Sequence, residues 1–248
     1  MPLAHQKPVS AALGFPNGRP RFSASHPAAR GISAGHGFSG IALAGGFINI
    51  LNGKPGVNAN SPTATINSAI GPCVNYSGTT MDSAFAGQST ANDAAVTFGV
   101  ILVVNTLSGA IQSIFQTGAA ATQGLRLYID ATNKPQISAV GVSNTGQTLA
   151  ALVTNVPYFI AASGTFVAGT GTTNFLIQRL DTGAYSFQNT ASTFAPAAGP
   201  NGTYIVGNSN LVTAGALSQI AAVMFAPIQI SMAELIGWAK NPWGFWYG

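Results

Sequence analysis

Short segments rich in β-branched and aromatic residues follow one another along the chain, separated by turn residues such as Asn, Gly and Pro. In residues 125–130, Leu125, Leu127 and Ile129 alternate with other residues and share one face of a strand. About a dozen such segments at spacings of roughly 8–15 residues, with no long helical period between them, predict an all-β sandwich or barrel. The predicted strands are residues 47–51, 73–76, 96–104, 111–115, 125–130, 136–142, 148–153, 158–162, 174–180, 185–188, 204–206 and 217–225.

The apolar stretch between residues 94 and 115 allows two interpretations. It carries no charge and is long enough for a transmembrane helix. However, Asn105, Gly109 and Gln112 interrupt it, which favours two buried strands joined by a loop. Residues 100–104 are apolar at every position, and such a strand fits a sheet that is covered on both faces. We therefore expect no membrane partner.

One helix is expected, over residues 231–240. Ser231 and Glu234 have the spacing of a capping box, in which each side chain accepts a hydrogen bond from the other residue's backbone N–H. Lys240 falls in the last turn, where it complements the helix dipole, and Pro242 ends the helix. The apolar face of the helix is formed by Met232, Leu235, Ile236 and Ala239.

Residues 1–40 differ from the rest of the chain. They are rich in Pro, Gly, Ser, His and Ala, contain no acidic residue and show no sustained period. This composition predicts an irregular basic N-terminal arm, followed by a sandwich domain over residues 41–248. The arm is either a disordered tail or a docking segment that becomes ordered against a neighbouring subunit. In the second case, Arg19, Arg21 and Arg30 are the candidate docking residues and face acidic partners.

Charge is scarce throughout the sequence. Of 248 residues, 9 are Lys or Arg and 5 are Asp or Glu, so that 6% are charged, whereas about 25% is usual. Because charge keeps soluble proteins apart, we expect other subunits, including copies of the same chain, to cover much of the surface. The few basic residues of the arm attract phosphate only weakly and no base-stacking platform is evident, so we expect no nucleic-acid partner.

The end of the chain forms an aromatic tail. All three tryptophans, Trp238, Trp243 and Trp246, lie in the last 11 residues, together with Phe245 and Tyr247. These rings could close the open end of the sandwich and pack against the helix. They could instead anchor an interface between subunits, because Trp and Tyr are frequent at interface hot spots. Stacking against a carbohydrate is a third use of the same rings.

Several motifs together resemble a known fold family. Residues 217–225, followed by residues 230–236, resemble the end of concanavalin A-like (laminin-G-like) sandwiches, in which the last strand leads into a short helix. Residues 71–78, 97–104 and 205–208 resemble earlier strands of that family, in the expected order. The resemblance implies a jelly-roll sandwich of two antiparallel sheets with one short C-terminal helix.

Two flanking motifs narrow the resemblance. Residues 26–31 and 241–247 are similar to laminin-G-like proteins of tailed-phage virions. The similarity implies a structural protein of the virion, in the capsid decoration, head or tail, that is assembled in the cytoplasm of the bacterial host. Its partners would then be other virion proteins. The alternative function is a carbohydrate-binding adhesion module for a host surface glycan, and a glycan hydrolase is the third hypothesis.

The residues needed for catalysis are scarce. Hydrolysis of a glycoside normally requires two carboxylates about 5–9.5 Å apart, but the single glutamate, Glu234, is assigned to the helix cap and no two carboxylates share a strand face at i and i+2. Calcium, which many relatives bind, takes about 6–8 oxygen ligands, and no Asp/Glu cluster is present. Cys73 is the single cysteine, and His5, His26 and His36 lie in the arm, where we expect them to be solvated. The sequence therefore predicts no enzyme activity, no metal and no cofactor.

Overall fold

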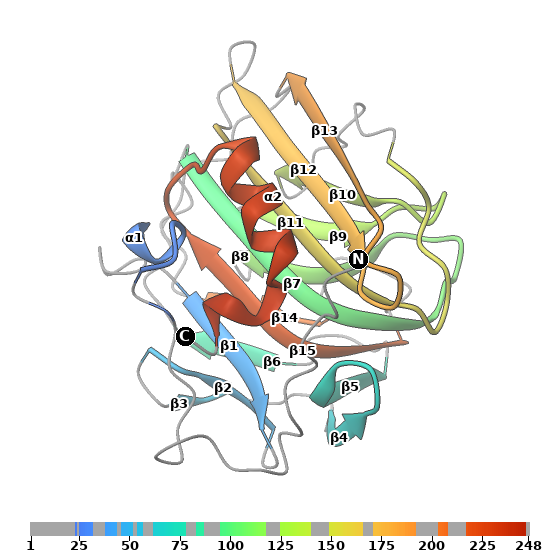
Figure 1. Cartoon of the computed structure of the whole chain (residues 1–248). Helices are drawn as coiled ribbons and strands as arrows, with labels where there is room; N and C mark the ends of the chain where they lie inside the picture. The colour runs from blue at the N-terminus through green and yellow to red at the C-terminus, as the bar shows by residue number, and fades with distance from the viewer. Residues whose placement is uncertain are drawn as a thin grey trace.

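The computed structural model describes residues 23, 25–31, 38–43, 46–51, 54–56, 62–77, 83–86, 95–117, 125–139, 149–165, 171–191, 203–207 and 217–246. Most of the regular structure in these residues is β, and the helix α2 lies near the C-terminus (Figure 1). The strands are β1 (Phe38–Leu43), β2 (Gly46–Asn49), β3 (Lys54–Pro55), β4 (Thr63–Asn67), β5 (Gly71–Ser77), β6 (Ser83–Ala86), β7 (Ala95–Thr106), β8 (Gln112–Thr117), β9 (Leu125–Ile129), β10 (Pro135–Ala139), β11 (Pro157–Thr165), β12 (Thr172–Arg179), β13 (Tyr185–Ala191), β14 (Thr203–Val206) and β15 (Leu217–Ala226). The helices are α1 (Ala29–Gly31), α2 (Met232–Lys240) and the 3-10 helix η2 (Pro242–Phe245).

Within the described residues, the strands form two antiparallel sheets, one of ten strands and one of five. The order in the large sheet is β13-β12-β11-β7-β15-β1-β2-β3, and β5 pairs with both β15 and β4. The order in the small sheet is β10-β9-β8-β14-β6. Neighbours in a sheet are often distant in the sequence, as for β7, which lies between β11 and β15. This arrangement confirms the predicted all-β sandwich of two antiparallel sheets with a C-terminal helix.

Most predicted strands coincide with observed ones, and the differences have local causes. The strand predicted at residues 148–153 is wrong, because residues 149–153 are irregular and insert Leu149 and Leu152 into the core without joining a sheet. Strand β1 begins at Phe38 and therefore includes the last residues of the segment assigned to the N-terminal arm. The pattern does not predict β3, β4 and β6, because these strands are short and contain few large apolar side chains.

A hydrophobic core fills the space between the two sheets. At its centre, the ring centroid of Phe115 on β8 lies 5.7 Å from the centroids of Phe38 and Phe98. The same centroid lies 6.0 Å from that of Tyr204 and 6.4 Å from that of Phe225. Because these four rings belong to β1, β7, β14 and β15, the cluster around Phe115 joins the two sheets.

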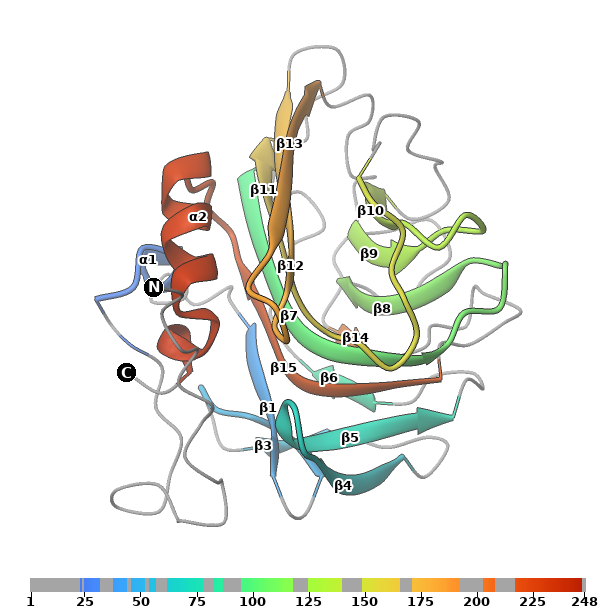
Figure 2. The ribbon, with the colours of Figure 1, turned by 45° about the vertical axis from the view of Figure 1, so that its right-hand side comes forward.

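The outer face of the large sheet carries a second hydrophobic core, formed with α2 and η2. Figure 2 shows α2 on one side of the large sheet and β8, β9 and β10 on the other, so that the molecule has three layers. Strand β7 contributes Val100 and Leu102 to the first core and Ile101 and Val103 to the second. A strand that is apolar at every position is thus buried on both faces, and the layer over its outer face belongs to the same chain.

A pair of buried hydroxyls holds the connection between β15 and α2. Thr97 on β7 and Ser163 on β11 lie opposite each other, with 2.8 Å between their oxygens. The Thr97 hydroxyl donates to the carbonyl of Ile228 at 2.7 Å, and the backbone N–H of Ile230 donates to the Ser163 oxygen, also at 2.7 Å. These bonds pair backbone groups that the chain would otherwise bury without partners as it enters the helix.

Candidate functional site

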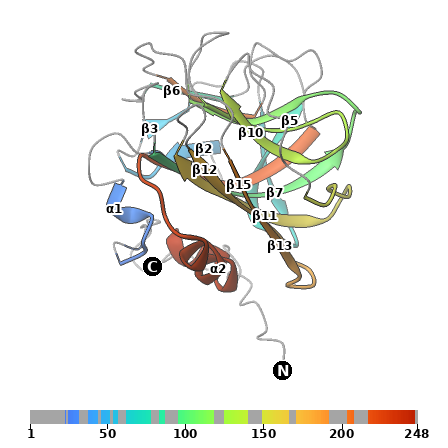
Figure 3. The same ribbon diagram turned by 90° about the horizontal axis from the view of Figure 1, so that it is seen from above.

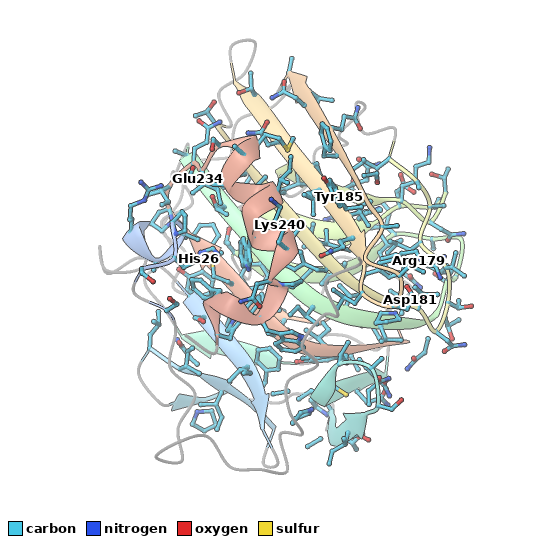
Figure 4. The ribbon with its side chains drawn as sticks, viewed as in Figure 1. His26, Arg179, Asp181, Tyr185, Glu234 and Lys240 are labelled. Atoms are coloured by element: carbon cyan, nitrogen blue, oxygen red, sulfur yellow. The ribbon has the colours of Figure 1, made fainter. Side chains whose placement is uncertain are left out.

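The start of α2 contains the capping box expected from the sequence. The backbone N–H of Glu234 donates to the Ser231 hydroxyl at 3.2 Å, and the backbone N–H of Ser231 donates to the Glu234 carboxylate at 2.7 Å. The other oxygen of this carboxylate accepts a hydrogen bond from Arg30 at 2.7 Å. Because the backbone N–H of Ser231 donates to the charged form, and the Ser231 hydroxyl and Arg30 add to this, the pKa of Glu234 is lowered. Figure 4 shows Glu234 at the end of α2 that faces the N-terminal segment.

The candidate docking residues lie in different parts of the chain. Arg30 belongs to α1, which lies beside α2 on the same side of the large sheet (Figure 3). Its acidic partner is Glu234 of the same chain. Arg19 and Arg21 lie outside the described residues. Of the three predicted docking residues, Arg30 is thus paired within its own chain, and the prediction for Arg19 and Arg21 is not tested by the described residues.

The aromatic tail is largely buried. Trp238, Phe245 and Trp246 belong to the second core, and Trp243 is half-buried against it. The centroid of Trp238 lies 5.7 Å from that of Phe245 and 5.8 Å from that of Trp246. These rings cover the outer face of the large sheet rather than the open end of the sandwich, and the three buried ones offer no surface to a second subunit or a sugar. Tyr247 lies outside the described residues.

His26 is not solvated, contrary to the expectation for a histidine of the arm. Its ring lies 4.8 Å from Trp238 and 5.3 Å from Phe245, both edge-to-face. The backbone N–H of Ala28 donates to His26 Nδ1 at 3.2 Å, which requires that this nitrogen carries no proton. Burial lowers the pKa of His26 to about 4, although the charge of Glu234 opposes this shift. The ring therefore packs in its neutral form.

The packing of neutral His26 predicts a pH dependence of stability. Since the pKa of histidine is about 6.5 in an unfolded chain, the contribution of His26 is fully present above that pH and is lost as the pH falls towards 4. We expect the free energy of unfolding to decrease over this window by at most about 1.4 kcal/mol per pH unit, and by less because the ring is partly exposed. Urea titrations from pH 7 to pH 4 would measure this slope.

The matched control for this titration is His26→Asn, whose side-chain oxygen can accept the hydrogen bond from Ala28. Its slope should be shallower between pH 6.5 and pH 4.5. The ordinary pKa values of the carboxylates lie at or below this window, so their protonation affects both proteins mainly at lower pH. Equal slopes in the two proteins would contradict the assignment.

The described carboxylates are all engaged in local structure. Asp130 accepts hydrogen bonds from Thr132, Lys134 and Gln136 in the turn between β9 and β10. Burial raises the pKa of Asp130, but these hydrogen bonds outweigh it, and the pKa is lowered. Asp181 forms a two-point pair with Arg179, whose hydrogen bonds lower the pKa of Asp181. None of these groups, nor Glu234, has the raised pKa of a general acid.

Other candidate chemistry is limited in the described part of the chain. Cys73 is buried in the second core, and burial raises the pKa of its thiol to about 11, which disfavours the nucleophilic thiolate. The described residues contain no group of three or more His, Cys, Asp or Glu side chains that could hold a metal ion. No helix among them has the length and apolar character needed to span a membrane.

Tyr185 and Phe187 form an exposed aromatic surface on the edge strand β13. Their exposed fractions are 48% and 54%, their ring centroids are 6.4 Å apart and their planes differ by 29°. Phe187 lies opposite Leu176 in the register of β12 and β13, and Leu176 belongs to the second core. Because paired residues of adjacent strands point to the same side of a sheet, this aromatic surface lies on the face that carries α2. Figure 4 shows Tyr185 on this side of the molecule.

Amide side chains lie next to the aromatic surface on the same face. Asn189, two residues beyond Phe187, donates to the side-chain oxygen of Asn174 at 2.7 Å. Gln178 lies opposite Tyr185, and its buried side-chain oxygen has no hydrogen-bond donor. Asn189 is exposed, whereas Asn174 and Gln178 are buried. Two exposed rings beside an exposed amide can pack against the apolar face of an amphipathic ligand and hydrogen-bond to its polar groups. We call the residues Tyr185, Phe187, Asn174, Asn189 and Gln178 the β13 surface.

The sequence pattern does not single out the β13 surface. Residues 185–188 predict a strand, but the alternation of aromatic and polar residues there is the same as in a strand whose aromatic face is buried. What exposes Tyr185 and Phe187 is the edge position of β13, which depends on the order of strands in the sheet. The concentration of tryptophans near the C-terminus instead directs attention to rings that the fold buries.

Comparison with solved structures supports the fold. The binding domain of botulinum neurotoxin serotype D is 12% identical with a TM-score of 0.54, and the match covers 82% of this chain and 51% of that one. The receptor binding domain of the botulinum neurotoxin C/D mosaic serotype is 11% identical with a TM-score of 0.51, covering 82% and 50%. A Trypanosoma rangeli sialidase in complex with sialic acid is 15% identical with a TM-score of 0.52, covering 82% and 32%.

These similarities are structural and partial. The chain spans between 32% and 51% of the length of the three proteins, and identities of 11–15% establish a shared fold alone. No protein-family model matches the sequence. No curated protein sequence matches it either. The chain thus shares the β-sandwich fold of these structures, and its function has to be inferred from its own residues.

Proposed function

We propose that the chain is a carbohydrate-binding module whose sugar contact is the β13 surface. The observation that carries this proposal is the exposure of Tyr185 and Phe187. They are the exposed aromatic residues among those described, in a chain whose other described rings are largely packed into its two cores. Large exposed apolar groups that lie together often mark a binding site.

The chemistry of the β13 surface suits a sugar. One face of a sugar ring presents C–H groups, which pack against aromatic rings, while its hydroxyl groups need hydrogen-bond partners. Tyr185 and Phe187 supply two adjacent rings, and the exposed Asn189, held by its hydrogen bond to Asn174, supplies an amide group beside them. The adjoining edge of β13 has no neighbouring strand among the described residues. The fold itself is compatible with this function, since its structural neighbours include neurotoxin binding domains and a sialidase in complex with sialic acid.

We further propose that binding is not followed by hydrolysis. The described carboxylates Asp130, Asp181 and Glu234 belong to a turn, an ion pair and a helix cap. Each has a lowered pKa, whereas a glycosidase needs one carboxylic acid that remains protonated near neutral pH. A reducing-sugar assay on any glycan that binds would test this point, and release of reducing ends would contradict it.

Substitution of the two rings tests the binding proposal. A glycan array followed by calorimetric titration of the best ligand should show binding by the wild-type chain. We expect Tyr185→Ala and Phe187→Ala each to weaken it about tenfold, which corresponds to about 1.4 kcal/mol per ring. Ile66→Ala is the matched control, because Ile66 is 77% exposed on β4, away from β13 in the sheet order. A chain that binds no glycan, or binding that survives the double substitution, would contradict the proposal.

As a second function, we propose that the module is part of a tailed-phage virion, as the resemblance of its flanking motifs implies. What favours this is that the two motifs, about 200 residues apart, pack against each other. The ring centroid of His26 in the first motif lies 5.3 Å from that of Phe245 in the second. Just before the first motif, the backbone N–H of Ser23 donates to the carbonyl of Phe245 at 2.7 Å. The two motifs therefore belong to one packed structural unit.

The virion proposal has its own test. Mass spectrometry of purified particles should detect the chain. Deletion of residues 2–22, which include Arg19 and Arg21, spares the segment that packs against α2. We expect the shortened chain to fold and to bind glycan as before, but not to be incorporated into particles. Normal incorporation would contradict docking through the N-terminal arm, and absence of the chain from particles would contradict the virion assignment.

A further inference from the structure

The small sheet has a polar face that points away from the core. Leu125, Leu127 and Ile129 of β9 point into the core between the sheets, so Arg126 and Tyr128 point to the opposite side. The register of the small sheet extends this polar face over three strands. One row across the sheet contains Gln116, Arg126 and Ser138, and the next row contains Ser113, Tyr128 and Gln136. In Figure 2 these strands lie on the side of the large sheet opposite α2.

These polar side chains are buried. Arg126 is only 7% exposed, and its guanidinium carbon lies 4.5 Å from the centroid of the Tyr128 ring. Its Nε has no hydrogen-bond acceptor, and no carboxylate among the described residues forms an ion pair with it. The buried hydroxyls of Ser113 and Ser138, on the strands to either side, also have no hydrogen-bond partner.

A buried cation without an anion is unfavourable. Removing a charge from water is costly unless a counter-charge or hydrogen bonds compensate it. The contact of the guanidinium with a single aromatic ring compensates only part of this cost. Consistent with this, burial lowers the pKa of Arg126, although a guanidinium remains protonated in proteins. A negative group beside Arg126 and the Ser138 hydroxyl would compensate the cost of burying this charge.

We propose that Arg126 forms a binding site for a small oxyanion, a carboxylate or a phosphate group, on the polar face of the small sheet. The planar guanidinium has parallel N–H groups that match the two oxygens of such a group. Ser138, directly opposite Arg126 on β10, supplies a further donor. The site is independent of the β13 surface, which lies on the opposite side of the molecule.

Thermal unfolding with three anions tests the site. Sodium acetate, sodium glucuronate and sodium phosphate are compared with sodium chloride at equal ionic strength. At a concentration ten times its Kd, a bound anion should raise the Tm of the wild-type chain by about 3–6 °C relative to chloride. Acetate tests for binding of a simple carboxylate, glucuronate for binding of a sugar acid, and phosphate for binding of a phosphate group. A rise with any of them that saturates supports the site and identifies its ligand class.

The control separates binding from general salt effects. In Arg126→Gln the rise over chloride should disappear, whereas Arg179→Gln, which removes an exposed arginine paired with Asp181, should retain it. Equal shifts in the wild-type chain and Arg126→Gln would overturn the proposal. If Arg126→Gln does not fold, an NMR titration of the wild-type chain decides instead. The Nε–H signal of Arg126 should move with saturation while that of Arg179 stays, and an unmoved Arg126 signal would overturn the site.

Discussion

Replacing Trp238 by alanine is expected to lower the free energy of unfolding by about 3–5 kcal/mol, the usual cost of removing a large buried aromatic side chain. Trp238 is 2% exposed and lies between α2 and the large sheet, with its centroid 5.0 Å from that of Phe159. Its indole N–H donates to the carbonyl of Pro242 at 3.0 Å, so the substitution also removes a buried hydrogen bond. Urea unfolding followed by tryptophan fluorescence or circular dichroism would measure the change.

The same substitution, combined with a measurement of oligomeric mass, distinguishes two roles of the aromatic tail. A ring that anchors an interface between subunits would, when removed, change the oligomeric mass and leave the stability of the single chain nearly unaltered. A ring that covers the sheet of its own chain should do the opposite. Trp243→Ala serves as the control. Because Trp243 is only half-buried, its substitution should lower the free energy of unfolding by less. If Trp238→Ala kept the free energy of unfolding of the wild-type chain but had a lower oligomeric mass in light scattering, the main role of Trp238 would be at a subunit interface.

Gly99 provides a second test of the same contact. A Cβ atom at this position would lie 2.3 Å from Cη2 of Trp238, so alanine cannot be accommodated unless the indole ring moves. We expect Gly99→Ala to lower the free energy of unfolding of the wild-type chain. The decrease should be much smaller in the Trp238→Ala background, where the space for the added methyl group is empty. Gly237→Ala is the matched control, because a Cβ there meets nothing within 4 Å. Equal costs of Gly99→Ala in both backgrounds would mean that the two residues are not coupled.

The features that were predictable from the sequence are those set by local pattern. The alternation in residues 125–130 specifies a strand wherever that strand lies in the sheet, and the Ser231–Glu234 spacing specifies a helix start by itself. Strand β1 was not predictable in this way. Phe38 and Ile41 lie among Gly, Ser and Ala, and they form a strand because β15 and β2 offer backbone partners on both sides.

The candidate site could not be predicted because its character depends on the neighbours of each strand. The aromatic residues of β13 are exposed because β13 is an edge strand, while Phe175 on the adjacent β12 points into the core between the sheets. In β9, the alternation correctly identifies the apolar face of Leu125, Leu127 and Ile129 but says nothing about what covers the face of Arg126. The fold buries Arg126 and Tyr128 on that second face as well. Their burial cannot be predicted from the sequence of β9 alone.

A comparison of two phenylalanines links stability to function. We expect Phe115→Ala to lower the free energy of unfolding by about 3–5 kcal/mol, because Phe115 is fully buried and contacts four rings from both sheets. Phe187→Ala removes the same atoms from a side chain that is 54% exposed and should change stability by no more than about 0.5 kcal/mol. Urea unfolding of both variants under identical conditions would measure the two values.

The small cost expected of Phe187→Ala is what gives the residue its functional interpretation. An aromatic side chain that stabilises its own fold needs no ligand to account for it, whereas an exposed one that contributes little stability is free to serve binding. Phe187→Ala should therefore combine an unchanged midpoint in urea with weaker glycan binding, and Phe115→Ala should lower the midpoint. If Phe187→Ala instead destabilised the chain as much as Phe115→Ala, the ring would be a packing element of the sheet edge, and the case for the β13 surface would lose its main support.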